Sequence, residues 1–211
     1  NSGHAGFRRI CGKAAAQMAE LHVPGVSIGV CHNGREHYAG LGVASIDTGM
    51  LVDADTLFQI GSISKPFVAQ AAVMLAEKDK LNLDVPIRRY LPGFKLTDSS
   101  VAARVTMRHL LTHTGGWFGD YFNDFGSGPD ALPRMVDAVG GLPQLLPLGK
   151  IFSYSNSGFY VAGRVLEKIS GRPFEALIKE LVFVPLGMDN SFYFAEDVIS
   201  RRFAVGHKFI K

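Results

Sequence analysis

Hydrophobic and polar positions follow two different periods in the first third of the chain. Apolar residues recur at helical spacing over residues 7–21, which predicts an amphipathic first helix. Residues 26–31 are typical of a strand, and Asn33-Gly34 is the strongest short signal for a hairpin turn. A return strand is predicted over residues 35–46, whose several glycines indicate close packing by another element.

The next stretch, FQIGSISKPFVAQAAVMLA at 58–76, is apolar for most of its length. It predicts a helix from about Ser62 to Lys78 that is buried on most faces, as expected of a central helix. Pro66 lies near the start of this helix, where the lost backbone hydrogen bond costs little.

The remaining chain has the pattern of helices and loops. An aromatic and glycine-rich loop is predicted over 117–129, and residues 189–211 are weakly patterned. The predicted helices follow capping, glycine and proline signals, and they cover 106–111, 133–139, 157–169 and 173–182.

These patterns divide the chain into an α/β part, residues 1–78, and a helical part, residues 79–211. We find no internal repeat and no low-complexity segment. Two strands in a hairpin do not form an independently stable sheet, so the sequence predicts that something else completes it.

Composition excludes several classes of function. Hydrophobic residues make up 47% of the 211 residues and charged residues 19%, as in a core-forming globular chain. The 22 basic and 19 acidic residues leave a formal charge of +3 with no basic run, so nucleic acid is not an expected partner. No apolar stretch reaches 18 residues without a charge, and no membrane span is expected.

The first residues and the two cysteines give little information on cellular location or disulfides. Residues 1–6 lack the pattern of a signal peptide, and the sequence leaves a periplasmic, secreted or cytoplasmic location open. Cys11 and Cys31 are expected to be buried free thiols on a helix and a strand, since two cysteines do not define a disulfide framework.

Ser62 and Lys65 are three residues apart at the predicted start of the central helix. Three residues are about one helical turn, so both side chains share a face. A lysine held neutral in a dry pocket can take the proton of a serine hydroxyl and make it a nucleophile. The pair alone is weak evidence, because about one Ser-x-x-Lys is expected by chance in a chain of this length.

Tyr154-Ser155-Asn156 stands between a Pro-Leu-Gly turn and a predicted helix. The tyrosine can relay a proton near the Ser–Lys pair, as phenolate or as hydrogen-bonded phenol, and the asparagine can hold the lysine or a substrate amide. The alternative is a turn with an N-capping serine or asparagine. A second Tyr-x-Asn, at 121–123, has no helix behind it and ranks lower.

Two further patterns match functional motifs in their letters but are better explained by structural roles. The letters Gly-x-Ser-x-Gly at 25–29 match the nucleophile elbow of α/β-hydrolases, but that elbow requires strand, turn and helix, and here the serine lies within a strand. His109 and His113 have the spacing of zinc ligands on a helix but lack a third ligand, so we expect structural roles and no metal site.

Three segments together carry a family resemblance: GSISK at 61–65, LLTHTGG at 110–116 and PLGKIFSYSNSGFYVAGRVLEKISG at 147–171. They resemble the serine β-lactamase and penicillin-binding protein superfamily. The tyrosine motif is similar to that of class C β-lactamases, D-alanyl-D-alanine carboxypeptidases and family VIII esterases. The resemblance implies a β-lactamase/transpeptidase-like fold, an antiparallel sheet flanked by helices with an inserted helical domain.

By motif position, the resemblance implies that Ser62 is the acyl-accepting nucleophile and Lys65 its proton acceptor. It implies that Tyr154 passes the proton to the leaving group, and that Asn156 contacts Lys65 and the acyl-side amide of the substrate. The expected function is hydrolysis of β-lactams or small carboxylic esters through an acyl-enzyme, without a cofactor. The alternatives are a D-alanyl-D-alanine carboxypeptidase and a penicillin-binding sensor that acylates without turnover.

The chain departs from the family at its third motif, a Lys or His followed by a small residue and Gly on an edge strand after the tyrosine motif. His113-Thr114-Gly115 and His32-Asn33-Gly34 match the letters but precede Tyr154. In the family that strand also supplies one of two oxyanion-hole N–H groups, the other being that of Ser62. We therefore expect the sheet to be incomplete here, and to be completed by a further C-terminal segment or a second chain.

Overall fold

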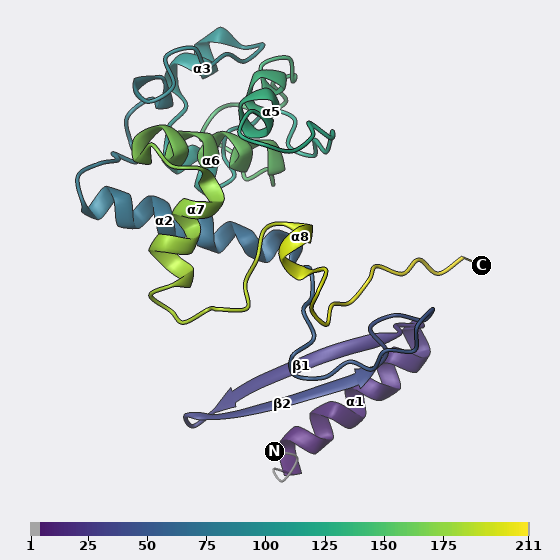
Figure 1. Ribbon diagram of the computed structural model, residues 1–211. Coiled ribbons are helices and arrows are strands. Elements are labelled where there is room, and N and C mark those ends of the chain that lie inside the picture. Colours follow the sequence, from purple (N-terminus) through teal and green to yellow (C-terminus); the bar gives the residue numbers. More distant parts are fainter. Residues whose placement is uncertain (1–4, 211) are drawn as a thin grey trace. The chain divides into compact units, whose positions relative to one another are not determined.

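A computed structural model describes residues 5–210 of the chain, which form two compact units (Figure 1). The first unit contains the residues up to Ile60 together with those from Asn190 onward. The second unit is Gly61–Asp189.

The first unit is built on a helix and a hairpin. Helix α1 (Ala5–Leu21) packs against both strands of the antiparallel pair β1 (Gly25–His32) and β2 (Arg35–Gly42). Asn33 and Gly34 have φ values of 51° and 71°, as a two-residue type I′ hairpin turn requires. The predicted hairpin and first helix are confirmed, although β2 ends at Gly42 and not at residue 46.

The last residues of the chain return to the first unit by backbone hydrogen bonds. Leu57 N–H donates to the carbonyl of Arg202 at 2.9 Å, and Ala204 N–H donates to the carbonyl of Leu57 at 2.8 Å. Val205 N–H donates to the carbonyl of Ala44 at 3.0 Å. The short helix α8 (Ala195–Val198) precedes this return. The weak pattern of this region in the sequence did not predict it.

The second unit is helical. Its core surrounds α6, which contacts α2, α4, α5 and α7. Fully buried side chains on several of these helices include Ala72, Leu110, Val161, Leu166 and Ile178. The elements of the unit are the 3-10 turn η1 (Gly61–Ile63), α2 (Ser64–Glu77), η2 (Ile87–Arg89), α3 (Ser99–Arg104), α4 (Met107–Leu111), α5 (Ala131–Val139), α6 (Asn156–Ser170), α7 (Phe174–Ile178) and the π-helical turn η3 (Lys179–Phe183).

Most of the predicted helices are present, with two differences. Helix α3 was not predicted, although Asp98 caps it by accepting hydrogen bonds from the N–H groups of Ser100 and Val101. Helix α2 is not buried on most faces, because Val73 is 41% exposed while Val68 and Ala71 are buried. The apolar composition of α2 predicted its helix but overestimated its burial.

The boundaries of the units differ from the division at residues 78 and 79 drawn from sequence patterns. Helix α2, placed there with the hairpin, packs with α6 and α7 in the second unit. The residues from 190 onward, placed with the helices, belong to the first unit. The sequence pattern reports local secondary structure. The division into compact units instead depends on contacts between residues far apart in the chain.

Within residues 5–210, no helix is both long and apolar enough to cross a bilayer. The same residues contain no cluster of three or more His, Cys, Asp or Glu side chains that could bind a metal ion. Cys11 and Cys31 are free thiols, as predicted, but their expected burial is wrong, because Cys11 is half-buried and Cys31 is exposed.

Candidate active site

Ser62 and Lys65 lie where the η1 turn passes into α2. Ser62 is in the turn and is exposed, and Lys65 is in the first helical turn and is half-buried. Their three-residue spacing brings Lys65 Nζ to 3.1 Å from Ser62 Oγ. This is hydrogen-bonding distance between a possible nucleophile and a possible base.

The Tyr154 motif forms the start of α6. Ser155 is the N-cap, and its hydroxyl accepts a hydrogen bond from Gly158 N–H at 2.9 Å. The N-capping role that the sequence analysis gave as the alternative is therefore present at Ser155. It does not compete with a chemical role for the neighbouring residues, because Tyr154 and Asn156 direct their side chains elsewhere.

Asn156 joins this helix start to α2. Its Oδ1 accepts a hydrogen bond from Lys65 Nζ at 2.7 Å, across 91 residues of sequence. Its amide group lies 3.4 Å from Asp120 Oδ1, a weak hydrogen bond. Lys65 is thus held between Ser62 Oγ and Asn156 Oδ1, and its direction is set from two helices.

Tyr154 lies beside the same Lys65 side chain. Lys65 Nζ is 4.7 Å from the centre of the Tyr154 ring and 5.5 Å from that of Phe159. Hydrogen bonding to Lys65, and secondly to Ser62, lowers the pKa of the Tyr154 phenol, against a smaller opposing effect of desolvation. A phenol that releases its proton more readily, next to a serine and a lysine, is suited to proton transfer.

A neighbouring loop supports the start of α6 from behind. The Gly119 carbonyl accepts hydrogen bonds from Asn156 N–H at 2.9 Å and Ser157 N–H at 3.1 Å. The buried Trp117 donates from Nε1 to Ser157 Oγ at 2.9 Å. A Cβ at position 119 would lie 2.4 Å from the Tyr154 carbonyl oxygen, so only glycine permits this approach.

Sequence reasoning did not identify Trp117, Gly119 and Ser157 as supports of the site. Trp117 is buried in the core. The single tryptophan and the nearby glycines were visible, but nothing local linked them to residues about 40 positions later.

The remaining candidates have structural roles. His109 Nδ1 accepts a hydrogen bond from Thr106 N–H at 3.1 Å as part of the capping box of α4. His113 Nδ1 accepts one from Ser155 N–H at 3.0 Å. In the second Tyr-x-Asn, Asn123 donates to the hydroxyl of Tyr121.

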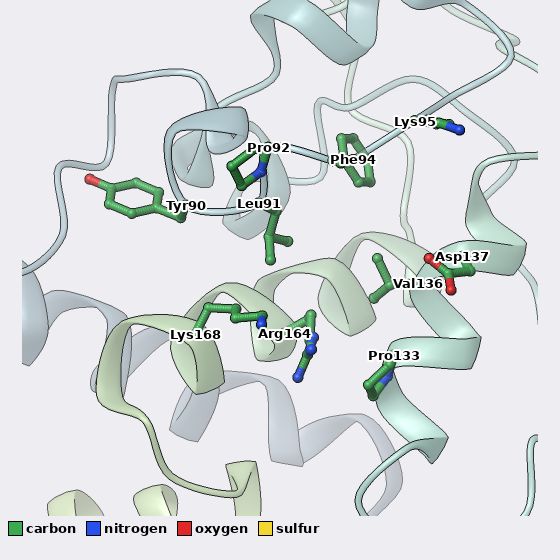
Figure 2. A pocket seen from close by; sticks show the side chains of 11 residues that line it. Tyr90, Leu91, Pro92, Phe94, Lys95, Pro133, Val136, Asp137, Arg164 and Lys168 are labelled. Atoms are coloured by element: carbon green, nitrogen blue, oxygen red, sulfur yellow. The ribbon is translucent and has the colours of Figure 1, made fainter.

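The second unit also contains a cavity of about 660 Å³ between α5, α6 and the segment after η2. Figure 2 shows its lining, which includes Leu91, Phe94, Val136, Arg164 and Lys168. None of the four predicted site residues lines it. Arg164 pairs with Glu167 at 2.8 Å, which offsets its charge.

Comparison with known proteins decides the family. The model of the family described as Beta-lactamase matches residues 12–209. The chain belongs to this family. The resemblance inferred from the three motifs is confirmed.

Individual relatives have different names. The chain is 35% identical over 192 residues to penicillin-binding protein 4 of Amycolatopsis lactamdurans, covering 91% of this chain and 50% of that protein. It is 36% identical over 179 residues to esterase EstB of Burkholderia gladioli, covering 78% of this chain and 45% of that protein. The chain spans about half the length of the curated relatives it matches.

A solved structure supports the fold. The class C β-lactamase of Rhodobacter sphaeroides superposes with a TM-score of 0.73 at 30% identity, covering 92% of this chain and 54% of that one. The β-lactamase/transpeptidase-like fold class is therefore confirmed, with an antiparallel sheet that has two strands among the described residues.

Proposed function

We propose that this chain carries the acylation centre of a serine hydrolase that works through an acyl-enzyme on Ser62. One observation carries the proposal. Lys65 Nζ lies 3.1 Å from Ser62 Oγ and 2.7 Å from Asn156 Oδ1, at the meeting point of two helix starts. A lysine in this position can accept the serine proton, and the hydrogen bond to Asn156 holds its amino group near Ser62.

The proposed reaction has two halves. Ser62 Oγ attacks the substrate carbonyl carbon while its proton passes to Lys65, and the tetrahedral intermediate collapses to an ester on Ser62. Tyr154 relays the proton to the departing amine or alcohol, which its lowered pKa favours. Water then attacks the acyl-enzyme, the acid is released, and Ser62 regains its proton. Asn156 holds Lys65 and binds the acyl-side amide of the substrate.

The proposed substrates are β-lactams or small carboxylic esters. The family includes relatives named as β-lactamase and as esterase, which supports both. A D-alanyl-D-alanine carboxypeptidase and a penicillin-binding sensor remain alternatives, and the relative named penicillin-binding protein 4 is the reason to test them. All four share one acylation step and differ in deacylation and in the shape of the substrate pocket.

We also propose that further strands complete the sheet in the active protein, from a later segment of its own chain or from a second chain. Within residues 5–210 the sheet has only β1 and β2, and a lone hairpin is marginally stable. An active, folded preparation with an intact mass near 22.9 kDa and no partner would refute this proposal.

The deciding experiment compares the full-length protein with its Ser62→Ala variant, using a chromogenic cephalosporin, a p-nitrophenyl ester and a D-alanyl-D-alanine peptide. Turnover of one substrate by the parent protein alone identifies the class. A stable adduct on Ser62 by mass spectrometry, without turnover, identifies the sensor. The absence of both turnover and an adduct with every one of these substrates would refute the proposed acylation centre.

A further inference from the structure

His113 stands directly behind the Tyr154 motif, in a strained backbone conformation. It follows α4 with a φ of 56°, in the left-handed region that few residues other than glycine adopt. Its carbonyl accepts a hydrogen bond from Ser153 N–H at 2.8 Å, and its ring Nδ1 accepts one from Ser155 N–H at 3.0 Å. Both neighbours of Tyr154 in the chain are therefore tied to this one residue.

The imidazole ring also contacts the Tyr154 side chain. The two rings are stacked, with centres 4.5 Å apart and planes 26° apart. The same imidazole lies 5.1 Å from the Phe159 ring centre and packs edge-on against Phe152 at 5.5 Å. Tyr154 and Phe159 are the two rings over which Lys65 Nζ lies. His113 thus supports the aromatic surface on which the lysine rests.

We propose that His113 is a positioning residue whose neutral ring fixes Tyr154, and through it Lys65, and whose protonation releases the site in acid. This inference rests on the proposed function of Ser62, Lys65 and Tyr154. The hydrogen bond from Ser155 is the reason for the protonation requirement. A backbone N–H only donates, so Nδ1 must keep its lone pair and the ring proton must be on Nε2.

The groups around His113 favour this neutral form. Lys65 on α2 is the charged group that acts on the ring, and Tyr154, before α6, is the titratable group stacked on it. Burial, and secondly the charge of Lys65, lower the pKa of His113 below its usual value of about 6.5. At neutral pH the ring is therefore an acceptor, and it gains a proton only in acid.

Protonation of His113 should lower both the acylation rate and the stability of the fold in acid. As pH falls through the lowered pKa of His113, the ring gains a proton and the Ser155 N–H loses its acceptor. The acylation rate should then fall by up to about 10²-fold, the scale expected when reacting groups are displaced by about 1 Å. Between about pH 6.5 and that lowered pKa the unfolded chain binds more protons, so stability should also decrease as pH falls.

Two variants of the full-length protein separate the contributions of the ring. His113→Asn tolerates the left-handed backbone and keeps an acceptor, but it does not titrate and does not stack. We expect it to lose the acid limb of the acylation profile that comes from His113. His113→Phe keeps an aromatic ring without an acceptor, and we expect slower acylation at all pH values.

His207→Asn is the matched control. His207 Nε2 also accepts a backbone N–H, from Ile46 at 3.1 Å, but it belongs to the first unit and not to the site. We expect this variant to leave the acid limb unchanged. Circular dichroism of each variant shows whether a loss of rate reflects unfolding.

A readout without substrate keeps the inference separate from the proposed function. ¹⁵N NMR of the parent protein should find His113 Nδ1 unprotonated at pH 7, with a ring pKa below about 6.5. A proton on Nδ1, or an acid limb that is unchanged in a folded His113→Asn variant, would overturn the inference. Absence of both turnover and a Ser62 adduct in the parent protein would instead overturn the proposed function, and the NMR result would still stand.

Discussion

The two units of the molecule contain very different cores. Among the described apolar residues of the first unit, only Phe7, Ala44 and Val52 are buried. In the second unit, α2, α4, α5 and α6 all contribute fully or nearly fully buried side chains. The first unit has only a two-stranded sheet within residues 5–210, whereas the second closes its helices around α6.

The well-packed helices are those that hold the proposed reactive centre. Ser62, Lys65, Tyr154 and Asn156 all belong to the second unit, and each lies at or just before the start of a well-packed helix. Catalytic geometry must be held within a fraction of an ångström, and packing supplies that restraint. The first unit has few buried side chains of its own that could restrain catalytic groups in this way.

The largest expected effect tests whether the chemistry resides in the second unit. Lys65→Met keeps the aliphatic stem but removes the base, and acylation of Ser62 should slow by about 10²–10⁴-fold. Pre-steady-state adduct formation, followed by mass spectrometry, measures this directly. Tyr38→Phe, on an exposed side chain of the hairpin, should leave the rate unchanged. Equal losses in both variants would contradict the comparison.

The next effect tests the packing difference itself. Ile178→Ala removes a fully buried side chain of α7 and should cost about 2–5 kcal/mol. Ile28→Ala makes the same change on half-buried β1 and should cost less than about half as much, because less apolar surface leaves water.

Trp117 is the only tryptophan of the chain and is buried in the second unit, so its fluorescence follows the unfolding of that unit. Denaturant unfolding monitored in this way should shift to lower denaturant for Ile178→Ala and little for Ile28→Ala. Equal shifts would mean that the two units unfold as one, and the distinction drawn here would fail.

A smaller effect compares the electrostatics of one tyrosine in each unit. Lys65 lowers the pKa of Tyr154, whereas hydrogen bonding to Glu36 raises the pKa of Tyr38. Lys65→Met should raise the pKa of Tyr154, and Glu36→Gln should lower the pKa of Tyr38, each toward about 10. Phenolate absorbance, taken as a difference from the matching Tyr→Phe variant, measures both. Shifts in the same direction for both tyrosines would be inconsistent with these assignments.

The smallest effect is a gain in stability in the first unit. A Cβ at Gly12, within α1, would meet no atom within 4 Å, so Gly12→Ala should stabilise the helix by about 0.5–1 kcal/mol. Gly40→Ala is its counterpart on β2, where a Cβ would meet the Val52 carbonyl oxygen at 2.1 Å. It should destabilise the hairpin. Hydrogen exchange of the β1 and β2 amides measures both changes, and protection that is unaltered in Gly40→Ala would count against this close approach.

Local patterns in the sequence were sufficient for most of the elements, though not for α3 or α8, and for half of the site. The Asn33-Gly34 turn, the Thr106 cap of α4 and the helical spacing of Ser62 and Lys65 involve residues no more than a few positions apart. Motifs in order along the chain added the family. Such features are readable because backbone dihedrals and capping hydrogen bonds depend on near neighbours.

The family resemblance implied the contact of Asn156 with Lys65, but the other contacts between distant groups appear only in the tertiary structure. There Trp117 meets Ser157 and His113 meets the backbone of Ser155, and one side of α2 is exposed. The physical reason is that each of these contacts forms only after the helices pack. Packing depends on the summed burial of many side chains, and no single stretch of the sequence records it.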